Sequence, residues 1–190
     1  MSPLQAQKLR NKGAEIPQKG PGPVICIRIY YTTRPGTGTF FLSVATIPRP
    51  TDVLLVEDNP SDVYLTQVAF RRSSPETQIH VVEDGIQAMA FLRHQAPYTS
   101  APRPDLVLLD LNLPRKHGHK VLREIKEDSQ LRGIPVIILT TSTAVADINL
   151  CYEDHANCYI SKPVDFDQFE KVVHEIESFW FQCVKLPRHD

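Results

Sequence analysis

The feature of this 190-residue sequence that most constrains its fold is a strand-then-helix rhythm that begins at residue 52 and occurs five times. Each repeat opens with a run of four or five mostly apolar residues, which suits a buried strand better than a helix. The predicted strands are DVLLV (52–56), IHVV (79–82), DLVLL (105–109), PVIIL (135–139) and CYIS (158–161). Strands that alternate with helices pair in parallel through right-handed crossovers. We therefore expect an α/β fold, a doubly wound five-stranded parallel sheet with helices on both faces.

Helical patterns fill the intervals between these strands. The first begins with Asn59 as a plausible N-cap, Pro60 at the first helical position and Asp62 in the first turn. The last is the longest, and its apolar residues keep helical spacing from Phe166 to Val184. The pattern predicts a single long helix over residues 166–184.

The first 50 residues have a different composition from the rest of the chain. They contain seven of the 16 prolines, five of the eight glycines, and seven basic residues against the single acid Glu15. Prolines and glycines at this density resist regular structure, and only VICIRIYY (24–31) alternates like a strand. We divide the chain into a basic arm (1–50) and a domain (51–190). The arm is interpreted as disordered or loosely packed, or as an artefact of the assigned start codon; basic arms are usually solvated, so nucleic-acid binding is not favoured.

Nothing in the sequence indicates secretion or membrane insertion. No apolar run approaches the roughly 18 residues of a membrane span, and charged residues occupy the region where a signal peptide would be apolar. The cysteines form no CxxC pair and show no metal-ligand spacing: Cys26, Cys151, Cys158 and Cys183. They are interpreted as small apolar residues in a reducing compartment, and the protein is expected to be cytoplasmic.

Polar residues follow four of the five predicted strands. They are Glu57 and Asp58 after the first, Asp110 after the third, Thr140 and Thr141 after the fourth, and Lys162 and Pro163 after the fifth. In an open parallel sheet, ligands bind in the crevice outside the carboxyl ends of the strands. We therefore expect these side chains to form one site.

The charges of this group favour a divalent cation. Three neighbouring carboxylates repel each other, and the single ammonium of Lys162 is insufficient to balance them. A hard ion such as Mg²⁺ (or Mn²⁺) suits oxygen ligands and keeps coordination positions for water and phosphate. The expected ligands are Glu57, Asp58, Asp110 and the backbone carbonyl of Asn112. With the metal held, an Asp110 oxygen can attack phosphorus while the cations neutralise the transferring group.

Each residue taken alone has a simpler explanation. An acid after a strand is commonly a turn former, Thr140 an ordinary strand-end hydroxyl, Lys162 a solvated loop lysine, and Tyr159 a core aromatic. The joint occurrence of acid pair, Asp, Thr and Lys-Pro after successive strands is what favours a phosphoryl site.

These residues also carry a family resemblance. Residues 51–186 resemble the receiver domains of two-component response regulators, through the motifs LLVEDNPSD, LVLLDLNLPRKHG, PVIILTTS and CYISKPV. The resemblance implies strand order 2-1-3-4-5, Asp110 as phosphoacceptor, and Glu57 and Asp58 as the metal-binding acid pair. It further implies that Thr140, Thr141 and Lys162 surround the phosphoryl oxygens, that Tyr159 is the switch aromatic, and that a cis bond precedes Pro163.

A narrower resemblance concerns the partner. LNLPRK and the ending FWFQCVKLP are similar to the small stand-alone regulators paired with phytochrome histidine kinases. The sequence departs from the family at His117, where an acid is usual, and at Asp154 and His155, where glycine is common. A sensor histidine kinase is therefore the implied partner, with phytochrome-type kinases the narrower expectation.

The end of the chain indicates how a signal would leave the domain. We expect no output domain after residue 190, so signalling would run through protein contact. Phe179, Trp180 and Phe181 are consecutive, and helical residues point about 100° apart, so at least one should face solvent. Exposed aromatics often mark interfaces, which favours a homodimer through the face of the fourth helix, fifth strand and fifth helix. Extra packing against the basic arm is the alternative.

Two other functions stay open. A phosphatase of the haloacid dehalogenase type also forms a phosphoaspartate after a parallel strand, but its second Asp is replaced here by Asn112. A pseudo-receiver that acts only as an interaction module usually lacks part of the acidic cluster, which this sequence keeps. Neither alternative explains the whole set of residues as well as a receiver that assists its own phosphorylation without being a true enzyme.

Overall fold

The computed structural model describes residues 50–187, and the predicted strand at 24–31 lies outside this range. The described chain forms a five-stranded sheet in the order β2-β1-β3-β4-β5, in which all pairs are parallel. The strands are β1 (Asp52–Val56), β2 (Gln78–Val82), β3 (Leu106–Leu109), β4 (Val136–Thr140) and β5 (Cys158–Ser161). The predicted fold class and strand order are confirmed, and each observed strand overlaps its predicted range.

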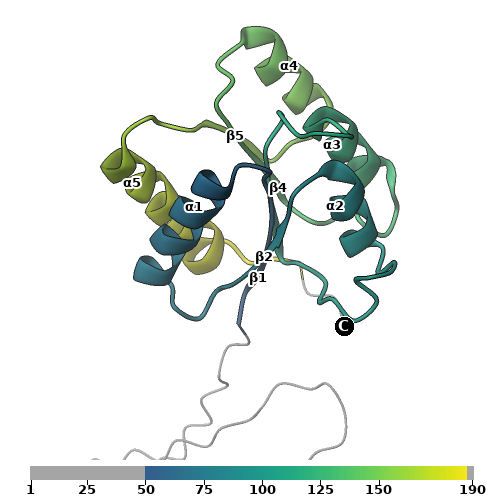
Figure 1. Ribbon diagram of the computed structural model, residues 1–190, viewed down its shortest axis with the longest axis horizontal. Helices are drawn as coiled ribbons and strands as arrows, with labels where there is room; N and C mark the ends of the chain where they lie inside the picture. Colours follow the sequence, from purple (N-terminus) through teal and green to yellow (C-terminus); the bar gives the residue numbers. More distant parts are fainter. Residues whose placement is uncertain (1–49, 188–190) are drawn as a thin grey trace, which may run out of the picture. The chain divides into compact units, whose positions relative to one another are not determined.

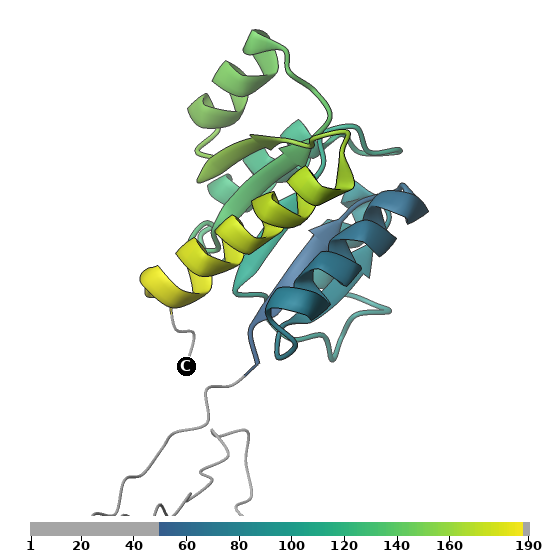
Figure 2. The same ribbon diagram turned by 90° about the vertical axis from the view of Figure 1, so that its left-hand side faces the viewer.

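In the part of the chain that the structure describes, five α-helices cover the two faces of the sheet (Figure 1). They are α1 (Pro60–Ser73), α2 (Gly85–Leu92), α3 (Gly118–Glu127), α4 (Val145–Glu153) and α5 (Phe166–Glu177). Helices α1 and α5 lie side by side on one face, as Figure 2 shows, and α2, α3 and α4 lie on the other. None of the helices described is long and apolar enough to cross a membrane.

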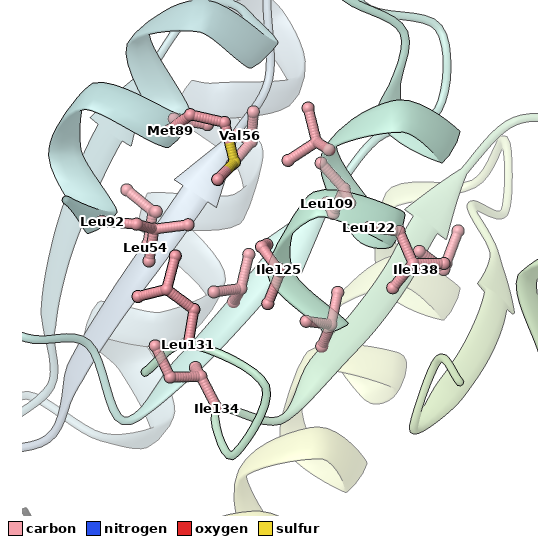
Figure 3. Close-up of a cluster of buried hydrophobic side chains, with 14 of the residues drawn as sticks. Leu54, Val56, Met89, Leu92, Leu109, Leu122, Ile125, Leu131, Ile134 and Ile138 are labelled. Carbon is pink, nitrogen blue, oxygen red and sulfur yellow. The ribbon is translucent and has the colours of Figure 1, made fainter. Parts of the chain in front are cut away.

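The sheet separates two hydrophobic cores. Because successive strand residues point to opposite faces, Leu54 and Val56 of β1 belong to one core while Val53 and Leu55 belong to the other. Figure 3 shows the larger core, in which β1, β3 and β4 meet side chains of α2 and α3 such as Met89. Burial on both sides explains why the central strands are continuous apolar runs rather than alternating ones.

Local signals set the starts of the helices that flank the strand ends. Asn59 Oδ1 accepts a hydrogen bond of 2.9 Å from the Ser61 amide, and Pro60 is the first residue of α1, as predicted. The buried carboxylate of Asp84 caps α2 by accepting from the amides of Ile86 and Gln87 at 2.7 and 2.9 Å. Each cap holds the loop between a strand and its helix in one conformation.

The prediction of a single long final helix over residues 166–184 is wrong for its last turns. Helix α5 ends at Glu177, and Ser178–Cys183 forms a π-helix that closes with a 3.0 Å bond from the Val184 amide to the Phe179 carbonyl. With this wider turn, Trp180 and Phe181 both pack partly against the core beside α1, while Phe179 is 55% exposed. Helical spacing alone did not distinguish the two helix types, because their periods differ little over one turn.

The cis bond implied before Pro163 is absent. Among residues 50–187, the cis peptide is Ala96–Pro97, and the bond between Lys162 and Pro163 is trans. The two isomers of an X–Pro bond differ by only about 0.5–1 kcal/mol, so the surrounding structure and not the local sequence selects between them.

The departure at His155 has a structural cost. His155 adopts a φ of 64°, in the left-handed region where a side chain is strained and where glycine is favoured. Its amide donates to the Tyr152 carbonyl at 3.1 Å as the chain leaves α4 for β5. This turn requires the left-handed conformation, whatever residue occupies it.

We therefore expect His155→Gly to stabilise the domain by about 0.5 kcal/mol, since about 1 kcal/mol of relieved strain exceeds the added entropy of the unfolded chain. Urea unfolding would measure the difference. The matched control is His174→Gly on the exposed side of α5, where glycine should cost about 1 kcal/mol. A loss of stability in both variants would contradict the assignment of strain at His155.

Candidate functional site at the carboxyl edge of the sheet

One ammonium group gathers the acids at the carboxyl edge of the sheet. Lys162 Nζ lies 2.8 Å from Asp62 Oδ2 and 2.9 Å from Asp110 Oδ2, and it also donates to Glu57 Oε2. The side chains of Lys162, Glu57 and Asp110 are only 6%, 3% and 7% exposed. Buried charges are stable only when paired, so these contacts are a structural requirement as well as a potential site.

The pairing changes the proton affinities of the three groups. Burial would lower the pKa of Lys162, but hydrogen bonds to Asp62 and Glu57 and the charges of Asp110 and Glu57 raise it above the ordinary value. Burial would raise the pKa of Asp110, yet Lys162 and bonds from Asn112 and Thr140 hold it below the ordinary value. For Glu57, the effect of burial is larger than the opposing effect of the hydrogen bond and charge of Lys162, so the pKa of Glu57 is raised above the ordinary value. Asp110 is therefore an unprotonated carboxylate at neutral pH.

The loop after β3 presents Asp110 to this edge. The Asp110 amide donates to the Val56 carbonyl at 3.1 Å, and Asp110 Oδ1 accepts from the Asn112 amide at 3.1 Å. The loop then turns back closely, because a Cβ on Gly118 would lie 2.2 Å from the Asp110 carbonyl oxygen. Only glycine fits at position 118, because any side chain would clash with the Asp110 backbone. The absence of a side chain lets the β3–α3 loop fold closely against Asp110.

The predicted switch residues lie around the end of β4 and on β5. Thr140 is fully buried and its side chain bonds Asp110, whereas Thr141 is exposed. Tyr159 is partly buried against the larger core, and its hydroxyl donates to the Ser142 carbonyl at 3.1 Å. Pro163, the residue after Lys162, is partly buried at the start of the β5–α5 loop.

The predicted metal ligands supply the right kind of atom. Glu57 and Asp110 face Lys162, while Asp58 and Asn112 are exposed beside them. Within residues 50–187, no three His, Cys, Asp or Glu side chains are gathered in a way that could hold a metal ion. Carboxylate and carbonyl oxygens are nonetheless the donors that a hard divalent cation prefers, so the donor set fits Mg²⁺ or Mn²⁺.

Two features of the site were not predicted. Asp62 was assigned only to the first turn of α1, yet it binds Lys162. The available signal was that α1 begins directly after the loop that follows β1, at the same edge of the sheet. Arg115, at a φ of 62°, reaches from the β3–α3 loop to the buried carboxylate of Asp84 at the start of α2. That ion pair joins residues far apart in the sequence, and no local pattern indicated it.

Comparison with known proteins identifies the family. Residues 53–174 match the model of the response regulator receiver domain. The chain belongs to this family. The haloacid dehalogenase alternative is therefore not supported.

The individual relatives agree with this assignment. The chain is 46% identical to the response regulator Rcp1 of Synechocystis sp. over 138 residues, which cover 73% of this chain and 94% of Rcp1. It is 42% identical over 139 residues to the probable methanogenesis regulatory protein FilR2 of Methanothrix harundinacea, covering 73% and 88% of the two chains.

Solved structures give the same result. The phosphorylated cyanobacterial phytochrome response regulator RcpA is 46% identical, with a TM-score of 0.70 over 73% of this chain and 99% of RcpA. The Mn²⁺-bound form of Rcp1 is 45% identical, with a TM-score of 0.70 over 73% of this chain and all of that chain.

Removal of the central ammonium should destabilise the domain in a pH-dependent way. We expect Lys162→Met to lower the free energy of unfolding by about 3 kcal/mol at neutral pH, because the acids at this edge lose their buried partner. The folded pKa of Asp110 is depressed, so its contribution is present above the unfolded pKa of about 3.9 and is lost as pH falls through the folded value. Urea unfolding at neutral and acidic pH should show the difference shrinking in acid.

Lys171→Met is the matched control, since Lys171 is exposed on α5 and its ammonium is not buried as that of Lys162 is. Its stability should differ little from that of the wild type at either pH. A pH-independent loss in Lys162→Met would mean that lost packing, and not charge pairing, accounts for the effect.

Proposed function

We propose that this protein is a single-domain response regulator that accepts a phosphoryl group on Asp110 from a sensor histidine kinase. The observation that supports this most strongly is the unprotonated, buried Asp110 carboxylate held 2.9 Å from the Lys162 ammonium at the open edge of the sheet. An Asp110 oxygen forms a bond to phosphorus while the bond from phosphorus to the kinase histidine nitrogen breaks. The imidazole leaves, and the product is an acyl phosphate on residue 110.

A divalent cation, Mg²⁺ or Mn²⁺, completes the site. Asp58, Asp110 and the backbone carbonyl of Asn112 would hold it, with Glu57 bound directly or through water. When bound, the cation neutralises charge on the transferring phosphoryl group. Lys162 contributes the second positive charge from the protein itself, and it exchanges some of its carboxylate contacts for phosphoryl oxygens.

Phosphorylation would act on the residues around β4 and β5. A phosphoryl group places about two negative charges at the edge, which attract the hydroxyl of Thr140. Thr141 and Pro163 shape the two loops that border the site, and Tyr159 follows Thr140 inward. The change shifts a two-state equilibrium and does not create a new fold.

The histidine kinase is proposed to be of the phytochrome type. Support comes from the similarity to RcpA, which is named as a cyanobacterial phytochrome response regulator. In this proposal residues 51–190 form the receiver module, and the protein is cytoplasmic, where its kinase would present the phosphohistidine. The complete acidic edge argues against a pseudo-receiver.

The first test is direct phosphorylation. Incubation of the purified protein with acetyl phosphate and Mg²⁺ should add the mass of one phosphoryl group, because Asp110 is a competent acceptor. Intact-mass spectrometry would detect the product, and Asp110→Asn should abolish it. Labelling that persists in Asp110→Asn would overturn the assignment of the acceptor; complete resistance of the wild type would favour the pseudo-receiver.

We further propose that the protein forms a homodimer through the face of α4, β5 and α5 and the C-terminal aromatics Phe179, Trp180 and Phe181. Exposed apolar side chains on or next to this face support the proposal: Val145 (70% exposed) and Tyr152 (51%) on α4, Val164 in the β5–α5 loop, and Phe179 (55%). Trp180 and Phe181 are partly buried and would hold Phe179 in place.

Phe179→Asp should therefore weaken the dimer at least tenfold, because a charge at the centre of an apolar contact must be desolvated. Analytical ultracentrifugation over a range of concentrations would measure the dissociation constant. Tyr64→Asp on α1 is the matched control, since Tyr64 is 65% exposed but lies on α1, outside the proposed face. A wild-type monomer at high concentration, with and without a phosphoryl analogue, would refute the dimer.

A further inference from the structure

The ammonium of Lys162 is fully occupied by the acids that surround it. Its Nζ donates to Glu57 Oε2, to Asp62 Oδ2 at 2.8 Å and to Asp110 Oδ2 at 2.9 Å. A lysine ammonium has three N–H donors, so each of these acids takes one of them. A phosphoryl oxygen can therefore bind Lys162 only where one of the three carboxylates gives up its contact.

Of the three acids, Asp62 gives up its contact at the lowest cost. The side chains of Glu57 and Asp110 are 3% and 7% exposed, whereas that of Asp62 is 27% exposed. A buried carboxylate that loses its partner keeps the full penalty of desolvation, but a partly exposed carboxylate can be solvated by water instead. Asp62 is therefore the acid whose place on Lys162 a phosphoryl oxygen can take.

Both partners of this ion pair are held in place by other contacts. Within α1, the Asp62 carbonyl accepts a 2.7 Å hydrogen bond from the Thr66 hydroxyl, which does not involve the Asp62 side chain. The Lys162 amide donates to the Thr140 carbonyl at 2.7 Å, and its ammonium keeps the two buried acids as partners. Removal of the Asp62 charge should therefore leave Lys162 where it is, with one N–H donor free.

The charge at the edge also makes Asp62 an opponent of an incoming phosphoryl group. The acids there outnumber the single ammonium of Lys162: they are Glu57, Asp58, Asp62 and Asp110. A phosphoryl group adds about two more negative charges. Asp62 is not one of the proposed ligands of the divalent cation, so its charge repels the phosphoryl group without directly holding the cation that would neutralise it.

We infer that Asp62 is a positioning residue that occupies, on the Lys162 ammonium, the place of a phosphoryl oxygen and thereby lowers the affinity of this edge for a phosphoryl group. The inference rests on the proposed function, in which Lys162 exchanges carboxylate contacts for phosphoryl oxygens. The contact with Asp62 is the one exchanged, and the released carboxylate still repels the new group from a short distance.

Binding of beryllofluoride, a phosphoryl analogue, in the presence of saturating Mg²⁺ measures this affinity without turnover. We expect Asp62→Asn in the full chain to bind beryllofluoride about tenfold more tightly than the wild type, because a charge close to the bound anion is removed. The affinity for Mg²⁺ alone should not rise, since the loss of a negative charge cannot favour a cation. Isothermal titration calorimetry provides both affinities.

Asp167→Asn is the matched control. Asp167 is likewise an acid in the first turn of a helix that follows a strand, α5, but it is not one of the acids that contact Lys162. Its substitution repeats the loss of one charge and of its interaction with the helix dipole. Beryllofluoride affinity in this variant should stay close to that of the wild type. A gain equal to that of Asp62→Asn would refute the specific role of Asp62.

Two further substitutions of Asp62 separate its charge from a purely structural role. Asp62→Glu keeps a carboxylate within reach of Lys162, so it should bind beryllofluoride about as the wild type does. Asp62→Ala removes the charge and the acceptor together, so it should tighten binding at least as much as Asp62→Asn.

The opposite results would identify a different role for Asp62. If Asp62 were needed to hold Lys162 in position, Asp62→Asn and Asp62→Ala would bind beryllofluoride more weakly than the wild type. Weaker or unchanged binding in these variants, equal tightening in Asp62→Glu, or a parallel rise in Mg²⁺ affinity would overturn the inference. A wild type that binds no beryllofluoride with Mg²⁺ would instead refute the proposed function, so the two failures are distinguishable.

Discussion

The arrangement of the site depends on one interaction, the contact of the Lys162 ammonium with the acids at the carboxyl edge of the sheet. An ammonium or a carboxylate buried alone would cost several kcal/mol, so the buried Lys162 requires its acidic partners and the buried Asp110 carboxylate requires Lys162. Their pairing keeps Asp110 ionised and positions a cation beside the oxygen that would react. The same contact thus explains both the stability of the edge and its suitability for phosphoryl chemistry.

The pairing is possible because the sheet holds its strands in a single parallel register. Val56 is opposite Leu109, and Leu109 is opposite Ile138, so Glu57 and Asp110 leave the sheet at the same level. A shift of one residue would turn each strand's side chains to the opposite face and disrupt both cores. The buried apolar runs that stabilise the fold therefore also determine where the charged residues emerge.

Hydrogen bonds connect the site to the rest of the domain mostly through the loop between β4 and α4. The β4–α4 loop is bonded at Ser142 to β4, β5 and α4, and His119 extends the connection to α3. The opposite border, the β3–α3 loop, is held by the Arg115–Asp84 ion pair. Thr140, at the start of this loop, bonds Asp110, and α4 after the loop carries the exposed apolar side chains Val145 and Tyr152.

The sequence alone determined the fold class, the strand positions, the start of α1 and which residues follow each strand, because these depend on local periodicity, capping and turn chemistry. It also placed Asp110 and Lys162 at one edge, since parallel strands end together. Tertiary structure alone decided that Asp62 joins Lys162, that Arg115 meets Asp84, and that the last helix widens into a π turn. These features depend on distances between segments remote in the sequence and on how side chains fill a shared core, which no local pattern encodes.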